Sequence, residues 1–293
     1  MTEAQRGHLA MLAFSALVAG SFSLGALAAP LISPAALTVA RFALAGALVG
    51  GSAVLTGGIP RRAFEAPWRY AVLGALLACY FVLMFEGLRT AAAVPTAAVF
   101  TLTPLMAAGF GFVLLGQVTT LRMAGALALG AAGAIWVIFR GDVVAMMALR
   151  VGRGEVIYFM GCIAHALYAP MVRRLNRGES ALVFTFGTLL AGFVLLVLWG
   201  GRAVLATDWA TLPAIVWICL AYVAIAASAM TFVLLQFAAL RLPAAKVMAY
   251  TYLVPTWVIL WEIAMGHGVP PVQVLAGIGL TMVALGLLLK DEG

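Results

Sequence analysis

The sequence predicts an all-α integral membrane protein in which ten transmembrane helices form two inverted five-helix repeats around a central cavity. Hydrophobic residues make up 65% of the 293 residues and charged residues only 9%, whereas a soluble domain carries about 25% charge. The mean hydropathy is +1.13. A soluble fold must keep its outer shell wet, so this much apolar surface is typical of a protein embedded in a bilayer.

Apolar runs bounded by charge, Gly or Pro follow one another along the chain, and each is long enough for a span of about 20 residues. The ten runs are 8–28, 34–56, 69–89, 91–115, 121–139, 154–172, 180–200, 212–236, 243–264 and 270–289. They use nearly the whole length, which leaves no room for a separate soluble catalytic module. Cys79, Cys162 and Cys219 fall in separate runs, so we expect neither a disulfide framework nor a metal site, and no cofactor.

The first run has two interpretations. Residues 9–25 are apolar, and Ala26-Leu27-Ala28 resembles a signal-peptidase site. The segment is therefore either a cleaved leader or the first membrane helix. We favour the helix, because the internal repeat described below needs ten spans.

The basic residues predict the orientation. With the N-terminus inside, the inner segments hold ten Lys and Arg residues and the outer segments five. The inner set is Arg6, Arg61, Arg62, Arg69, Arg122, Arg173, Arg174, Arg177, Arg241 and Lys290, and the outer set is Arg89, Arg140, Arg150, Arg153 and Arg202. The positive-inside rule then predicts that both termini are cytoplasmic, although the three arginines of the 140–153 loop count against this orientation. The expected location is the inner (plasma) membrane. The net charge of +7 thus reports topology, and no nucleic-acid partner is expected.

Two segments show that the chain repeats at about half its length. They read GLRTAAAVPTAAVFTLTPLMAAGFGFVLLGQ at 87–117 and ALRLPAAKVMAYTYLVPTWVILWEIAMGH at 239–267. In each, Leu-Arg opens an Ala-rich helix, a proline follows within it and a glycine closes it. Five spans is an odd number, so the second half inserts upside down, a common plan for secondary transporters. The predicted domains are 1–140 and 154–293, joined by the loop 141–153.

Pro104 and Pro255 occupy equivalent positions near mid-membrane and are predicted helix kinks. Each proline leaves a carbonyl four residues back, Phe100 or Thr251, without its helical donor. An unpaired carbonyl in hydrocarbon costs several kcal/mol unless protein, water or ligand satisfies it. Either neighbouring helices or a hydrated cavity can supply the missing hydrogen bond to each carbonyl. The equivalent positions of the two prolines favour the cavity.

At this level of detail the chain resembles the drug/metabolite transporter superfamily, in particular its EamA-type ten-helix members. The resemblance rests on Arg41-Phe42, the Leu-Arg-x-x-x-Ala openings, the two prolines and Gly116-Gln117. It implies that helices 1–4 and 6–9 surround a cavity, that helices 5 and 10 are peripheral, and that metabolites such as amino acids are carried, frequently outward. Glutamates common in the family before the proline and after the closing glycine are replaced here by Thr103, Val254, Gln117 and His267. This departure counts against proton coupling through those carboxylates.

His165 lies about eleven residues into the sixth run, close to mid-membrane, where an ionisable group usually faces the interior or water. It shares a helical face with Tyr158, Cys162 and Tyr168. This face either binds substrate, or its His and Tyr side chains satisfy one another between helices.

The remaining candidates lie on four other helices. Tyr250 and Trp257 flank Pro255, Tyr80 lies at mid-depth, and Thr103 is on a small-residue face that suits packing as well as a lining. Lys246 either snorkels to the interface or attracts a carboxylate, and Arg41 holds a substrate carboxylate or pairs with helix-end carbonyls. The predicted substrate-binding residues are therefore Tyr80, His165, Tyr168, Tyr250, Trp257, Thr103, Arg41 and Lys246.

These features predict a secondary transporter that moves small metabolites by alternating access. Aromatic residues and few buried charges favour amino acids with aromatic or hydrophobic side chains, and the resemblance favours export. Proton-coupled efflux of drugs or other metabolites is the alternative, and a uniporter is as plausible as an antiporter. An intramembrane enzyme or a channel is a distant option, since no HExxH, GxSxG or continuous polar stripe occurs, and no GxxxxGK[ST] loop indicates ATP.

The expected partners are the substrate and the lipid bilayer. The small residues Ala126, Gly130 and Ala134 permit close helix approach, either within the fold or in a dimer. The oligomeric state stays open, with a monomer slightly favoured.

Overall fold

The computed structural model describes residues 2–148 and 150–290 as an all-helical bundle. Within these ranges ten helical segments are long and apolar enough to cross a membrane, which confirms the predicted fold class. The uninterrupted spans are α1 (Glu3–Ala28), α2 (Pro34–Thr56), α3 (Trp68–Leu88), α6 (Leu121–Ile138), α8 (Arg153–Leu175), α9 (Ala181–Ala206) and α14 (Val272–Leu289). Short helical turns at Arg61–Phe64 and Trp209–Thr211 and the helix α7 (Val143–Met147) lie in connecting loops.

The other three spans are interrupted. The fourth consists of α4 (Ala93–Phe100) and α5 (Thr103–Leu115). The eighth joins α10 (Ala214–Ala224) to α11 (Thr231–Ala239) through a π-helical segment, Ile225–Met230. The ninth joins α12 (Ala244–Ala249) to α13 (Val254–Ala264) through a 3₁₀ turn, Tyr250–Leu253.

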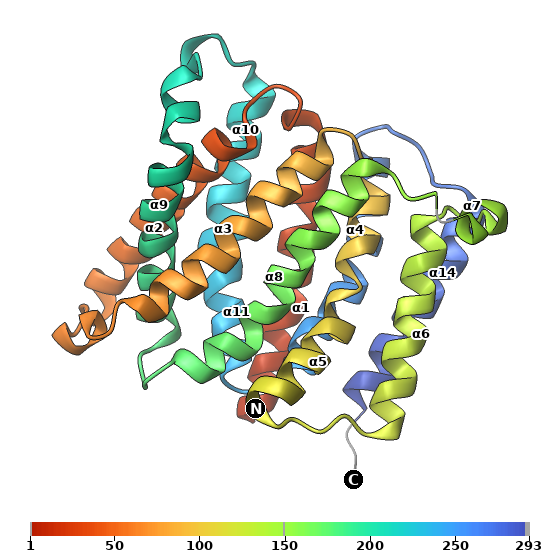
Figure 1. Ribbon diagram of the computed structural model, residues 1–293, viewed down its shortest axis with the longest axis horizontal. Coiled ribbons are helices and arrows are strands. Elements are labelled where there is room, and N and C mark those ends of the chain that lie inside the picture. The colour runs from red at the N-terminus through yellow and green to blue at the C-terminus, as the bar shows by residue number, and fades with distance from the viewer. Residues whose placement is uncertain (1, 149, 291–293) are drawn as a thin grey trace.

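The two halves of the chain run in opposite directions through the bundle. The first span starts at the end where both termini lie, and α8, the sixth span, starts at the other end (Figure 1). Five helices per repeat therefore produce the inversion that the sequence predicts.

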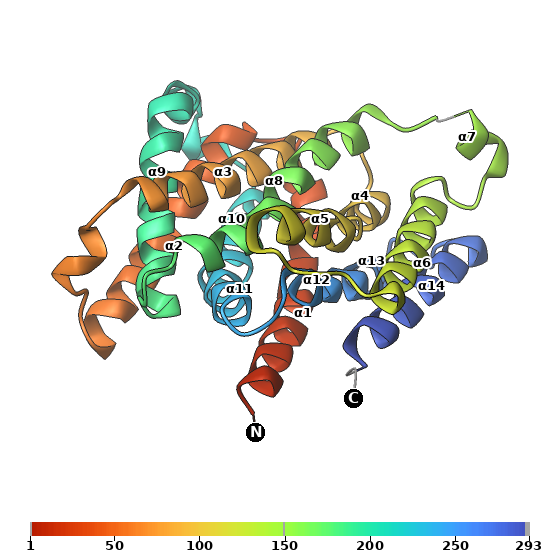
Figure 2. The ribbon, with the colours of Figure 1, turned by 60° about the horizontal axis from the view of Figure 1, so that its bottom comes forward.

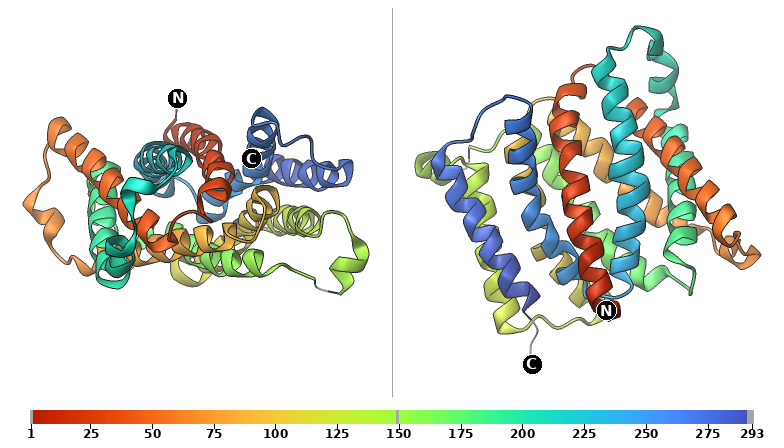
Figure 3. Two further views of the ribbon diagram at one scale, coloured as in Figure 1. Left: turned by 90° about the horizontal axis from the view of Figure 1, so that it is seen from above. Right: turned by 180° about the vertical axis from the view of Figure 1, so that it is seen from behind.

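The bundle has a centre and two edges. α1 lies in the middle, between α11 and α13 (Figure 3). Figure 2 shows α6 and α14 together at one edge, and α2 and α9 together at the other. The fifth and tenth spans are thus peripheral, whereas α2 at the opposite edge contributes buried residues such as Arg41 to the interior.

Both prolines begin a helix. Pro104 lies in the first turn of α5 and Pro255 in the first turn of α13, where a missing N–H costs nothing because first-turn amides have no helical acceptor. The carbonyl of Phe100 accepts a hydrogen bond from the Thr103 hydroxyl at 2.7 Å. A protein side chain therefore satisfies this carbonyl, and the hydrated cavity that we favoured is not needed there.

The small-residue stripe of α6 packs inside the fold. Ala126, Gly130 and Ala134 are buried, and a Cβ on Gly130 would overlap the ring of Tyr252 in the ninth span. Of the two uses that the sequence leaves open, the structure shows packing within the fold.

Candidate substrate site

A cluster of aromatic rings fills the interior between α3, α4 and α8. The Tyr80 ring stacks on His165 with centroids 4.3 Å apart, and Phe100 lies 5.1 Å from His165. The Tyr80 and Tyr158 hydroxyls are 2.9 Å apart. The Tyr168 ring lies in a plane nearly parallel to the imidazole of His165, with the two centroids 6.5 Å apart. We call Tyr80, Phe100, Tyr158, His165 and Tyr168 the aromatic cluster.

Three of the predicted binding residues, Tyr80, His165 and Tyr168, thus come together. Their side chains are buried because the face of α8 predicted from the sequence packs against α3 and α5. In this conformation the faces of these rings lie against one another, in the offset and tilted arrangements that stabilise aromatic pairs.

Arg41 adjoins the aromatic cluster. It is fully buried on α2, with Cζ 3.6 Å from the centroid of Phe81, whose ring is 4.5 Å from that of Tyr80. Its Nε donates to the Ser228 hydroxyl and its Nη2 to the Ala227 carbonyl, both in the π-helical segment. Arg41 therefore connects the two repeats at the side of the cluster.

Gln236 of α11 is a residue that the sequence reasoning missed. It is fully buried, and its amide Nε2 donates to the Tyr168 hydroxyl at 3.0 Å and lies 3.5 Å from Thr188 Oγ1. Thr188 donates its own proton to the Phe184 carbonyl, so it accepts from Gln236, and the Nε2 side of the amide is the one that faces it. The feature of the sequence that could have indicated it is a single amide side chain at the end of the long apolar run 212–236.

Several buried polar atoms of this region have no hydrogen-bond partner among residues 2–148 and 150–290. They are Nη1 of Arg41, both ring nitrogens of His165 and Oε1 of Gln236. Leaving a buried polar group unpaired costs about 1–3 kcal/mol, and more for a charged group. Such orphaned atoms are typical of a site that receives a ligand or water.

Tyr250 and Trp257 bond to α1. The Tyr250 hydroxyl is 3.1 Å from Nδ1 of His8, and Trp257 Nε1 donates to Ser15 Oγ at 3.2 Å. Thr103 lies where the fourth and ninth spans cross, with its hydroxyl 3.2 Å from that of Thr251.

Lys246 lines a separate cavity of about 470 Å³ near the end of the bundle that holds the termini. Arg122, Lys290 and Gln117 line the same cavity. The structure therefore distributes the predicted site over the cluster, the face of α1 and this cavity.

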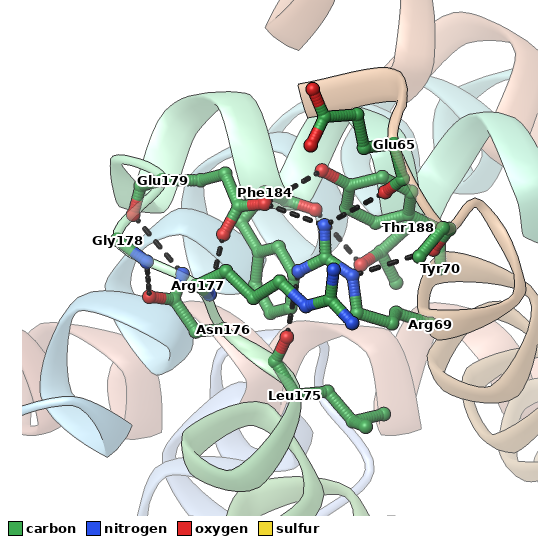
Figure 4. A network of polar contacts seen from close by, with 11 residues as sticks. Glu65, Arg69, Tyr70, Leu175, Asn176, Arg177, Gly178, Glu179, Phe184 and Thr188 are labelled. Atoms are coloured by element: carbon green, nitrogen blue, oxygen red, sulfur yellow. Dashed lines mark hydrogen bonds and ion pairs between the residues drawn. The ribbon is translucent and has the colours of Figure 1, made fainter. Parts of the chain in front are cut away.

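A buried ion pair joins the start of α3 to the α8–α9 loop (Figure 4). Arg69, in the first turn of α3, donates to the Glu179 carboxylate at 2.7 Å and to the Leu175 carbonyl at 2.7 Å. Burial disfavours the ionised carboxylate, but the hydrogen bonds from Arg69 and the Arg177 amide outweigh it and lower the pKa of Glu179 below its ordinary value. The pair fastens the first repeat to the α8–α9 loop, a role that the sequence did not indicate.

The site is closed in this conformation. Arg41, Tyr80, Tyr158 and Tyr168 have no exposed surface, so the cluster becomes accessible only when the helices around it move apart.

The comparison with known proteins agrees with this architecture. A family model described as the EamA-like transporter family matches residues 5–139 and 152–290. This chain belongs to the EamA-like transporter family. The two matched segments lie on either side of the loop between the repeats, and the EamA-like fold accounts for the ten spans.

Two individual proteins extend the comparison. A protein of Bacillus subtilis (strain 168), named uncharacterized transporter YyaM, is 25% identical over 283 residues, covering 96% of this chain and 92% of the relative. A solved crystal structure with 19% identity superposes with a TM-score of 0.75 over 98% of this chain and 97% of the other, which shows the fold alone. The family and the relative identify this EamA-like chain as a multi-pass membrane transporter of small molecules.

Proposed function

We propose that this EamA-like transporter carries amino acids with aromatic or large hydrophobic side chains across the inner membrane by alternating access, in the outward direction. The observation that supports this proposal best is the stack of Tyr80, His165 and Phe100 between the repeats. Ring faces without an acidic neighbour suit a flat, apolar side chain.

The distribution of acidic residues favours facilitated transport over proton coupling through a carboxylate. Every Asp and Glu within residues 2–148 and 150–290 lies in a loop or within three residues of a helix end. Proton-coupled carriers use ionisable groups inside the membrane as relays. Flux is therefore expected to follow the substrate gradient when no ion gradient is imposed.

Radiotracer counterflow in liposomes that contain only the purified protein tests the proposal. The panel contains Phe, Tyr, Trp and Leu, with Glu and Lys as charged comparisons, and no ion gradient. We expect saturable exchange of the aromatic members. Tyr80→Leu is expected to lower kcat/KM for Phe about 10-fold, because one ring contact contributes roughly 0.5–1.5 kcal/mol beyond its area.

Phe112→Leu is the matched control. It is the same kind of truncation at a ring that is 60% exposed on the outer surface of α5, and it should leave exchange unchanged. Absence of exchange for every amino acid, together with flux of a cationic drug, would replace this proposal with drug efflux.

A further inference from the structure

Arg41 carries a positive charge that has no acidic counterpart at its depth in the described part of the bundle. It is the eighth residue of α2, about 10 Å along the helix from its start. The described acidic side chains all lie at helix ends or in loops. A buried charge is normally paired, because removing it from water without a partner costs several kcal/mol.

The surroundings of Arg41 hold its guanidinium in one orientation. The Nε–H bonds to Ser228, one Nη2–H bonds to the Ala227 carbonyl, and the ring of Phe81 covers one face. The π-helical segment presents both acceptors, since Ser228 donates to the Val223 carbonyl five residues back. Backbone and hydroxyl thus position the arginine without neutralising it.

Part of the guanidinium edge stays free. Nη1 has no partner among the described residues, and a guanidinium has five N–H donors, of which two are used here. The unused donors on Nη1 and Nη2 form the fork that binds a carboxylate through two parallel hydrogen bonds.

The free fork and the aromatic cluster are contiguous. The Phe81 ring lies against both the guanidinium and Tyr80, and Tyr80 stacks on His165. Phe81 is thus the shared neighbour of Arg41 and Tyr80, which makes the cluster the adjacent position for the aromatic ring of a molecule whose carboxylate binds Arg41. An ammonium group has no described carboxylate in this region to bind, and the arginine repels it.

We propose that Arg41 is the carboxylate receptor of this transporter and that its substrate class is aromatic monocarboxylates, with the amino group dispensable. The inference rests on the proposed function and narrows it, because amino acids become one subset of the class. The carboxylate satisfies Nη1 and neutralises the buried cation, so its binding stabilises the protein.

Competition in the liposome assay compares the contribution of the carboxylate group to binding with that of the ammonium group. The probes are 3-phenylpropionate, which lacks the ammonium, and 2-phenylethylamine, which lacks the carboxylate, each against radiolabelled Phe. We expect 3-phenylpropionate to inhibit within about 10-fold of unlabelled Phe and the amine to be at least about 30-fold weaker. A 30-fold ratio corresponds to about 2 kcal/mol, the lower end for removing one partner of a buried charge pair.

Arg41→Gln should abolish this preference and weaken 3-phenylpropionate at least about 30-fold. Arg89→Gln, the same change at an exposed arginine that pairs with Glu86, should keep the preference. Equal inhibition by the two probes in the wild-type protein would overturn the proposal, as would an unchanged preference in folded Arg41→Gln protein.

Ligand-induced thermal stabilisation of the detergent-purified wild-type protein provides a readout that needs neither flux nor a folded variant. We expect 3-phenylpropionate to raise Tm and 2-phenylethylamine to leave it unchanged, and the reverse would contradict the carboxylate receptor. If Phe is not exchanged but 3-phenylpropionate stabilises the protein, the amino-acid function fails while the receptor stands. If Phe is exchanged and both probes raise Tm equally, the proposal that Arg41 is the carboxylate receptor is wrong, while the amino-acid transport function stands.

Discussion

Arg41 and Arg69 are both fully buried arginines, but their neighbours give them different roles. Arg69 is neutralised by Glu179 and also bonds to backbone carbonyls of Leu175 and Glu65. Arg41 bonds to a hydroxyl and a carbonyl and lies over an aromatic face, and within residues 2–148 and 150–290 it has no ion-pair partner. The first arrangement is complete and holds the fold together, whereas the second leaves charge and donors for a ligand.

The Arg69–Glu179 pair predicts an acid-dependent stability. Because the folded-state pKa of Glu179 is lowered, its contribution is fully present above the ordinary glutamate pKa of about 4.3 and is lost as pH falls through the lower folded value. Glu179→Gln should destabilise the protein at neutral pH by about 3 kcal/mol, the cost of breaking a buried pair. It should also flatten the dependence of Tm on pH below about 5.

Thermal unfolding of the detergent-solubilised protein between pH 3 and 7 provides the measurement. Glu65→Gln is the control, because the Glu65 side chain is exposed and only its backbone carbonyl bonds to Arg69. If Tm falls equally steeply with decreasing pH in the wild-type and Glu179→Gln proteins, the ion pair does not control stability in acid.

Single residues were only partly predictable from the sequence. The face of α8 that carries Tyr158, His165 and Tyr168 follows from helical spacing, which is a local property. Gln236 was missed because its partners, Tyr168 and Thr188, lie 68 and 48 residues away along the chain. No local pattern indicates which distant helix an isolated amide meets.

At the scale of helices, close backbone approach fixes the peripheral pair α6 and α14. A Cβ on Gly133 would lie 2.6 Å from the Gly277 carbonyl oxygen, and a Cβ on Gly277 would lie 2.8 Å from that of Gly133. Small residues at such crossings let helices pack without a hydrophobic driving force in lipid. The pair is thus held by contacts that a single methyl group would disrupt.

Gly277→Ala should therefore destabilise the protein by about 1–3 kcal/mol, the usual cost of overpacking. Gly279→Ala in the same helix has nothing within 4 Å of the added Cβ and should be neutral or stabilising by up to about 1 kcal/mol. Tm values of the two variants in one detergent provide the comparison. Equal Tm values would mean that α14 shifts freely on α6.

The interrupted helices show a second limit of prediction. The sequence places Pro104 and Pro255 at equivalent positions within the fourth and ninth spans, and both spans are interrupted there. Periodicity cannot indicate that Thr103 supplies the missing hydrogen bond to Phe100, since this depends on a side-chain rotamer. It also gave no sign of the π-helical segment that presents Ser228 to Arg41.

At the scale of the whole molecule, span count and inversion follow from hydropathy and the half-length repeat. Both are global properties that survive errors of several residues at each boundary. The closed conformation was not predictable, because it depends on packing across the two repeats. The membrane orientation rests on the count of basic residues and stays a prediction.

Thiol labelling in oriented membranes tests that orientation. In a Cys79→Ala background, Arg61→Cys should react with an impermeant maleimide only from the cytoplasmic side and Val144→Cys only from outside. Both positions are exposed in loops at opposite ends of the bundle. The reverse pattern would place both termini outside.

The central claim is that the aromatic cluster is the substrate site, and the native thiol of Cys162 tests it most directly. Cys162 is fully buried on the same face of α8 as His165, so it reacts only when the cluster opens. In a Cys79→Ala, Cys219→Ala protein, its labelling rate with a permeant maleimide is measured with and without saturating Phe, and with Glu as control. We expect slow labelling that Phe slows further and Glu does not, because substrate bound in the opened cluster shields the Cys162 thiol from the maleimide. A rate that is the same with and without Phe, in protein that exchanges Phe, would place the substrate site elsewhere in the bundle.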